Sequence, residues 1–396
     1  MYSTLNADIR PGAGLGIFEI GDSLWTILDK LRANNHMFPQ VDVKYDPDSS
    51  VTTPIIVHVR PHLDLLFSGK GQRLHTISVR QLRDPNPPVT LQYNGNVISS
   101  TEQVLRRVLV SRTFGPTYPG DDLRYPGLWF SFEDDSITEG IARGGQVPDR
   151  EQEVKRVFIS QKGNDGKGED ALDEVKEGAA MEGDVSRAIV KRHDGIVLNF
   201  FGSAKQFLVR LGETTAQDLT LDLGPPSKVH FKEDERMTIH SSKKQGETKE
   251  DTGYFYNYFQ HGIDFLISDT THIVKKVVLH TNIPGAPLFQ RYKRCCWEIE
   301  GMPEDDEDGE GPVVISPPLR VLTLCLDTPP RKRFYDRFET ISHFLSPHGT
   351  PPSMLLDRAD EEDDLTLPSS PTRLYGYDGI ILEVTESSQV VCVILF

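Results

Sequence analysis

The chain has 396 residues, of which 37% are hydrophobic, and its formal net charge is −16 at pH 7. This length allows two or three domains, and the apolar share is enough for a packed core. The excess of acidic residues argues against nucleic acid as a main partner, because binding to phosphate backbones depends on clustered lysine and arginine side chains.

The cysteine spacing and the N-terminal sequence indicate the cellular compartment of the protein. Cys295, Cys296, Cys325 and Cys392 lack the paired spacing of a zinc site or of a disulfide framework, so we expect a reducing compartment. The N-terminal stretch has no apolar signal region, and no run approaches the ~18 to 20 apolar residues of a membrane-spanning helix. These features predict a cytoplasmic protein whose contact with membranes is peripheral.

Residues 1–16 are small, polar and rich in glycine. Gly12, Gly14 and Gly16 resemble a nucleotide-binding loop, but the pattern predicts no strand before them and no helix directly after them. We therefore expect a flexible N-terminus here.

An eighteen-residue frame recurs without gaps in three places, at residues 62–79, 262–279 and 379–396. Each copy has two apolar runs separated by a polar or glycine-containing turn, which predicts an antiparallel β-hairpin. A fourth, interrupted copy has its first strand in residues 127–133 and its second in residues 154–159.

The frame extends upstream into helices. Residues 17–31 match residues 208–223: in both, a strand ends in glycine, an acidic residue and serine or threonine, and a pattern of apolar residues three and four apart follows. Asp22 or Ser23 is the expected N-cap of the first helix. Further helices are predicted near residues 101–109 and 333–345.

These elements predict an α+β fold, with repeated helix plus antiparallel β-hairpin units that form two or three sheets with helices packed on them. The predicted divisions are a flexible N-terminus (1–16), unit 1 (17–88), unit 2 (89–160), a disordered loop (161–188), unit 3 (189–300), an acidic linker (301–316), and unit 4 (317–396) with an acidic loop at 357–372.

Catalytic and metal-binding motifs are not recognisable. His58, His62 and Asp64 have the spacing of ligands on one face of a strand, but Pro61 interrupts that strand and no fourth ligand is in view. There is no Gly-x-Ser-x-Gly nucleophile motif. We therefore predict no catalytic residues, no metal site and no cofactor.

A basic segment stands out from the acidic whole. Residues 270–297 contain no Asp or Glu, yet they include Lys275, Lys276, Arg291, Lys293 and Arg294. One hypothesis is that these five side chains attract a phosphorylated lipid headgroup or an acidic partner surface. The alternative is a solvated strand face whose counterions lie in the acidic tracts of the chain.

An aromatic run precedes the basic segment and includes Tyr254, Tyr256 and Tyr258. Alternation along a strand buries one set of side chains and leaves the other at the surface. We therefore consider these three tyrosines as possible contact residues, beside the alternative that they belong to the core.

The same region carries a family resemblance. The segments that carry it are Leu223-Gly-Pro-Pro-Ser-Lys-Val229, Met237-Thr-Ile-His-Ser241, 251–259, His261-Gly-Ile-Asp264, Thr271-His272, Val274-Lys-Lys-Val277, Leu279-His-Thr-Asn282 and Pro284-Gly285, with Phe114-Gly-Pro-Thr-Tyr-Pro-Gly120 and the opening Gly21 helix. Together they resemble the signature core of the phagosome assembly factor 1 family. The loops at 161–184 and 241–252 and the acidic tracts depart from it.

The resemblance implies a non-enzymatic adaptor in autophagy. It implies pairing with a β-propeller protein of the breast carcinoma amplified sequence 3 type and recruitment to the phagophore assembly site, where phosphoinositides are displayed. Two alternatives stay open: a vesicle-trafficking scaffold at the Golgi or endosome, and a cryptic hydrolase whose site is assembled from distant residues.

Overall fold

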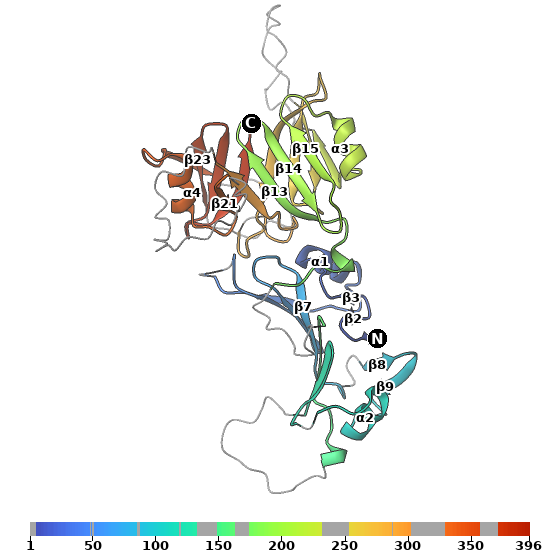
Figure 1. Cartoon of the computed structure of the whole chain (residues 1–396). Helices are drawn as coiled ribbons and strands as arrows, with labels where there is room; N and C mark the ends of the chain where they lie inside the picture. The colour runs from blue at the N-terminus through green and yellow to red at the C-terminus, as the bar shows by residue number, and fades with distance from the viewer. Residues whose placement is uncertain are drawn as a thin grey trace, which may run out of the picture. The chain divides into compact units, whose positions relative to one another are not determined.

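The computed structural model describes residues 5–47, 49, 51–84, 88–118, 120–132, 149–162, 174–231, 253–286, 288–301, 329–356 and 371–396. The chain divides into two compact units, Met1–Glu182 and Gly183–Phe396 (Figure 1). Among the described residues, each unit contains two β-sheets, and no sheet takes strands from both units.

The smaller sheet of the first unit has five strands in the order β3-β2-β1-β8-β9. Its strands are β1 (Leu5–Arg10), β2 (Gly14–Leu15), β3 (Phe18–Glu19), β8 (Val89–Tyr93) and β9 (Asn96–Ser99). β1 and β8 lie in the middle and pair in parallel, with Leu5 opposite Val89. The expected flexible N-terminus therefore contains a central strand, in which the alternating residues Ala7 and Ile9 are buried.

The larger sheet of the first unit has seven strands in the order β10-β11-β12-β7-β6-β5-β4. These are β4 (Val41–Lys44), β5 (Ile55–Val59), β6 (Leu63–Phe67), β7 (Leu74–Val79), β10 (Leu123–Tyr125), β11 (Leu128–Ser131) and β12 (Arg156–Ser160). All of their pairings are antiparallel.

The second unit repeats this arrangement with a five-stranded sheet, β15-β14-β13-β20-β21, and an eight-stranded sheet, β16-β17-β18-β19-β25-β24-β23-β22. The five strands are β13 (Val185–Lys191), β14 (Gly195–Phe200), β15 (Gln206–Arg210), β20 (Trp297–Glu300) and β21 (Arg331–Arg333). The eight are β16 (Lys228–Phe231), β17 (Tyr254–Tyr258), β18 (Ile263–Ile267), β19 (Val274–His280), β22 (Ser353–Leu356), β23 (Thr372–Tyr377), β24 (Ile380–Val384) and β25 (Val390–Leu395).

The two units share their order of elements. β13 and β20 pair in parallel at the centre of the five-stranded sheet, as β1 and β8 do. β19 and β25 join the two halves of the large sheet, as β7 and β12 do. β16 and β4 are therefore equivalent edge strands, and this equivalence allows one unit to serve as a reference for the other.

The three ungapped copies of the eighteen-residue frame form antiparallel hairpins, which confirms that part of the sequence prediction. They are β6–β7, β18–β19 and β24–β25, and each has a shift of register near the end of its first strand. The turns hold Gln72, His272 and Ser388 at positive φ. The interrupted copy forms the antiparallel pair β11–β12.

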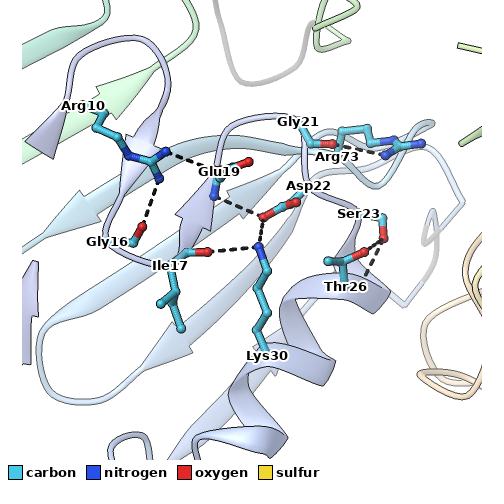
Figure 2. Close-up of polar contacts among 10 residues, drawn as sticks. All are labelled: Arg10, Gly16, Ile17, Glu19, Gly21, Asp22, Ser23, Thr26, Lys30 and Arg73. Carbon is cyan, nitrogen blue, oxygen red and sulfur yellow. Dashed lines mark hydrogen bonds and ion pairs between the residues drawn. The ribbon is translucent and has the colours of Figure 1, made fainter. Parts of the chain in front are cut away.

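Helix α1 (Leu24–Ala33) is capped by Ser23, whose side-chain oxygen accepts a hydrogen bond from the Thr26 backbone N–H. Figure 2 shows the polar contacts at this helix start. The Asp22 carboxylate accepts hydrogen bonds from Lys30 Nζ at 2.7 Å and from the Glu19 backbone N–H at 3.1 Å. Arg73 donates to the Gly21 carbonyl oxygen at 3.2 Å. The start of the helix is thus fixed to β3 through Glu19 and to Arg73, the residue before β7.

The other α-helices among the described residues are α2 (Arg107–Phe114), α3 (Ala216–Leu223) and α4 (Phe338–Leu345). α3 begins with a capping box between Thr215 and Asp218, and the Asp218 pKa is lowered by the backbone and side-chain hydrogen bonds from Thr215. Phe114 of α2 packs on Phe130 of β11 with ring centroids 5.3 Å apart. Short 3₁₀ turns cover Asp149–Glu151 and Ala179–Met181.

The predicted α+β fold class is wrong. Sheets of five, seven, five and eight strands dominate, whereas each described α-helix has only eight to ten residues. A two-stranded hairpin cannot bury both of its faces alone. The hairpins therefore join into large, mostly antiparallel sheets instead of remaining separate helix-plus-hairpin units.

Several predictions fall on residues that the structure does not describe. These are the acidic linker after Gly301, the acidic loop up to Ser370, and the charged loop at 241–252. Of the predicted loop at 161–188, only 161–162 and 174–188 are described, and there Glu174 accepts hydrogen bonds from Ser68, Lys70 and Gly71. No helix in the described part of the chain is long and apolar enough to cross a membrane.

Candidate functional site in the second unit

The hairpin β18–β19 is the scaffold of the site. Ile263, Phe265 and Ile267 are fully buried on one face of β18, and Asp264 points to the other face because side chains alternate along a strand. The segment 281–296 follows β19 and returns to this hairpin: Cys295 N–H donates to the His280 carbonyl oxygen at 2.9 Å. The site thus consists of a sheet face and the loop that lies against it.

The three predicted contact tyrosines share one face of β17 but differ in burial. Tyr258 is fully buried and donates to the Gly224 carbonyl oxygen at 3.0 Å, which ties the end of α3 to the sheet. Tyr254 is buried and lies 3.0 Å from His272 Nδ1. Burial raises the pKa of both phenols, so they stay protonated hydrogen-bond donors. Only Tyr256 is half-exposed.

Three of the five predicted basic residues reach solvent. Lys275 and Lys276 are exposed on β19, and the Lys276 ammonium lies 5.8 Å from the centre of the Phe396 ring. Arg291 is half-buried, with its guanidinium 5.6 Å from the centre of the Phe259 ring. Positive charge is therefore present at the surface of this region.

The other two basic residues are buried and hold the structure together. Lys293 forms an ion pair with Asp184, and Arg294 Nε donates to the Thr281 carbonyl oxygen at 2.8 Å. Both residues are only 5% exposed. The five residues thus do not form one surface, and the hypothesis of a contact patch stays a prediction for Lys275, Lys276 and Arg291 only.

A buried polar cluster, which the sequence did not lead us to expect, joins the loop to the hairpin. Asp264 Oδ2 accepts a hydrogen bond from the Tyr292 hydroxyl at 2.7 Å and lies 2.9 Å from His280 Nε2. The Tyr292 and His280 rings are stacked, with centroids 3.7 Å apart. Burial, and then the charge of Asp264, raise the pKa of Tyr292, which keeps its proton on the hydroxyl.

This cluster is incompletely satisfied among the described residues. Asp264 Oδ1 and His280 Nδ1 are buried and have no hydrogen-bond partner there. An unpaired buried polar atom carries a desolvation cost, so removing one more partner from Asp264 will be expensive. These contacts indicate that the cluster anchors the loop that carries Arg291, Lys293 and Arg294.

The first unit has a related but more open arrangement. Asp64 takes the same position in its hairpin as Asp264, and its Oδ1 lies 2.6 Å from His58 Nδ1 and 3.1 Å from an Arg80 nitrogen. His62 Nδ1 lies 3.3 Å from the Arg80 carbonyl oxygen. An aspartate stands at this position in two of the three ungapped copies of the frame, whereas the third has Ile381. This recurrence was the sequence signal for Asp264, but it does not point to His280 or Tyr292.

His261 precedes Gly262 at the start of the hairpin. Burial lowers its pKa to about 4, and the nearby Lys293 charge acts in the same direction, while Asp184 opposes it. His261 is therefore neutral at pH 7. This makes it a pH-sensitive structural residue in this segment.

The cysteines and histidines do not gather into a metal site in the described part of the chain, where no group of three His, Cys, Asp or Glu side chains could hold an ion. Cys295 and Cys392 are buried, and Cys296 is half-buried. Burial raises the pKa of the Cys295 thiol, which disfavours the nucleophilic thiolate. Cys325 lies outside the described residues.

Comparison with known proteins gives one consistent result. A family model described as phagosome assembly factor 1 matches residues 14–396. A PHAF1 protein of Arabidopsis thaliana is 26% identical over 409 residues, which cover 98% of this chain and 92% of the relative. One of Drosophila melanogaster is 26% identical (99% and 94% covered), and one of Caenorhabditis elegans is 24% identical (96% and 90% covered). No solved structure matches the chain.

Proposed function

Because the chain belongs to the phagosome assembly factor 1 family, we propose that it is a non-enzymatic adaptor in autophagy that associates with the phagophore assembly site. Its main attachment is a β-propeller partner of the breast carcinoma amplified sequence 3 type. Contact with phosphoinositide lipids is secondary. The observation that carries the proposal is the family match over nearly the whole chain, supported by relatives of similar length in plant, fly and worm.

The charge distribution supports attachment through a partner. With a net charge of −16, the whole chain is repelled by anionic membranes at long range. The exposed Lys275 and Lys276 and the half-buried Arg291 are few, and each basic residue near a membrane surface contributes only about 1 kcal/mol. Binding to a protein partner and binding to lipid at the same time give more stable recruitment than either contact gives alone.

The candidate site supports a binding role more than catalysis. A general acid or base must reach the proton that it transfers. Asp264, His280 and Tyr292 are only 4–5% exposed, and the Asp264 carboxylate is already engaged by the Tyr292 hydroxyl and by His280. This favours an adaptor over the hydrolase alternative.

The experiment combines a pull-down with liposome flotation. The purified full chain is used as bait in cell extract, recovered proteins are identified, and the chain is then floated on vesicles containing phosphoinositide with and without the recovered partner. We expect a β-propeller protein to be recovered and flotation to depend on it. Strong flotation of the chain alone would contradict attachment through the partner.

Charge variants separate the two contributions. The combined variant Lys275→Glu, Lys276→Glu and Arg291→Glu should remove any flotation that the chain shows without partner, because it reverses the exposed charges. The matched control reverses the exposed Lys44, Arg112 and Arg124 of the first unit and should float as the unmodified chain does. Equal flotation of the two variants would exclude the basic residues of β19 and its loop as the lipid contact.

A further inference from the structure

The strand β16 is the edge of the eight-stranded sheet. Among the described residues it pairs only with β17, in antiparallel register from Lys228 opposite Asn257 to Phe231 opposite Tyr254. The outer side of an edge strand presents alternating backbone N–H and C=O groups that can pair with another strand. All four side chains of β16 are exposed.

Two of these exposed side chains are apolar and lie on the same face. Val229 is 42% and Phe231 67% exposed. Their register partners are Tyr256 and Tyr254, and the Phe231 ring packs against Tyr254 with centroids 5.6 Å apart. Tyr254 in turn lies 5.4 Å from Tyr256. Phe231 is thus the exposed end of a row of aromatic side chains that also includes Tyr254 and Tyr256.

The equivalent edge of the first unit is protected. In β4, Val41 and Val43 are half-buried, and the outward Asp42 pairs with Arg60 at 2.9 Å. Charged and paired side chains on an edge discourage further strand pairing. β16 has the same place in the order of strands and also carries a lysine, Lys228, but its apolar Val229 and Phe231 are exposed where Val41 and Val43 of β4 are half-buried, so its edge is less protected.

The other two side chains of β16 are basic. Lys228 and His230 alternate with Val229 and Phe231, and β16 has no acidic residue. Across a strand pair, opposite charges are favourable and like charges are unfavourable. A strand added to this edge would therefore be favoured if it alternated apolar and acidic side chains.

We propose that β16 binds an extended segment of another protein as a ninth strand, with apolar side chains of that segment against Val229 and Phe231 and acidic side chains opposite Lys228 and His230. This is the strand-addition mode of peptide recognition, in which backbone hydrogen bonds supply affinity and alternate side chains supply specificity. The proposal does not depend on the role in autophagy, because it rests on the edge position and side chains of β16 alone.

The first test uses fluorescent eight-residue peptides and fluorescence anisotropy. A peptide alternating valine and glutamate should bind, and a peptide alternating valine and lysine should bind about fivefold more weakly or worse, because the cross-strand charge pair with Lys228 is lost and replaced by repulsion. The Lys228→Glu variant should reverse this order of preference. Equal binding of both peptides, or no binding of either, would overturn the proposal.

Backbone pairing is tested with two N-methylated versions of the acidic peptide, each methylated on one alternate set of amides. A strand added to one edge uses only one set, so one version should lose binding and the other should keep it. Hydrogen exchange should show new protection in residues 228–231 when the unmethylated peptide is bound. Loss of binding in neither version would exclude strand addition.

Variants locate the binding edge. Val229→Glu and Phe231→Glu should each weaken acidic-peptide binding about tenfold or more, because each removes an apolar contact and adds a like charge. The control is Met354→Glu on β22, the opposite edge of the same sheet, where Met354 is 70% exposed. This control should bind as the unmodified chain does. Equal losses in the control would contradict the assignment to β16.

A dimer in sedimentation that disappears in Phe231→Glu would instead assign the edge to a second copy of the chain.

Discussion

Asp264 is the residue on which the candidate site depends most. Its Oδ2 accepts from Tyr292 at 2.7 Å and lies 2.9 Å from His280, and these contacts hold the loop after β19 against the sheet. Tyr292→Phe removes one of the two partners and leaves a buried carboxylate short of a donor. We expect the free energy of unfolding to fall by about 1–3 kcal/mol, measured by urea unfolding of the full chain.

The control for this variant is Tyr118→Phe, which removes a hydroxyl from a side chain that is 91% exposed. A change within about 0.5 kcal/mol is expected for such a surface substitution. Equal effects of the two substitutions would show that the Tyr292 hydroxyl does not stabilise the site.

His261 predicts a pH dependence whose sign follows from its lowered pKa. The folded pKa is about 4, below the unfolded value near 6.5, so the unfolded chain binds more protons between these values. Stability is then full above pH 6.5 and falls as the pH drops toward 4. Between pH 7 and pH 5 this residue should cost the folded chain about 2 kcal/mol.

The measurement is the free energy of unfolding of the full chain at pH 7 and pH 5, compared with His261→Gln. The glutamine variant should lose less stability on acidification, by about the amount assigned to His261. An NMR titration of the histidine ring protons gives the folded pKa directly. A His261 resonance that titrates near 6.5 would contradict the account.

The sequence predicts where the basic residues of the site lie along the chain, but it does not predict which of them are buried. Strand spacing placed Lys275 and Lys276 on one strand, and both are exposed. Lys293 and Arg294 were grouped with them because they are near in sequence. Their burial depends on Asp184, distant along the chain, and on the carbonyl oxygen of Thr281, and neither contact leaves a local signal.

The turns between strands depend on specific backbone conformations. Gly262 has φ +70°, and a Cβ built on it would lie 2.1 Å from the Lys293 carbonyl oxygen. Gly262→Ala should therefore cost about 3 kcal/mol or more, since left-handed strain and a backbone clash add. Urea unfolding of the full chain measures this loss.

Gly95→Ala is the matched control. Its φ is +77°, yet nothing lies within 4 Å of the added Cβ, so only the strain of about 1–2 kcal/mol is expected. A Gly262 variant no less stable than the Gly95 variant would show that the loop does not approach the hairpin this closely.

Hairpins were predicted because alternation is a local pattern, whereas the order of strands in a sheet is not. The frame at 62–79 identified β6 and β7, but nothing local indicates that β12 pairs with β7 or that β8 pairs with β1. The helix predicted near 101–109 starts instead at Arg107, because Ser100 and Gln103 close a local turn first. Likewise, residues 331–333 form β21 on the edge of a sheet, and α4 starts only at Phe338.

The two units have separate sheets, and we therefore predict that they unfold separately. β25 lies between β19 and β24, so deleting residues 389–396 removes an inner strand of the eight-stranded sheet. We expect hydrogen-exchange protection to collapse in β17–β19 and β22–β24 and to persist in β5–β7. Collapse in both units would show that they fold as one cooperative body.

We propose that this acidic member of the phagosome assembly factor 1 family is an adaptor that reaches autophagic membranes through a partner. The most direct measurement is the colocalisation of the fluorescently tagged full chain with autophagic markers in starved cells, with and without the β-propeller partner. The account predicts puncta that appear on starvation and disappear when the partner is removed. Undiminished recruitment to autophagic markers without the partner, or residence at the Golgi regardless of starvation, would contradict it.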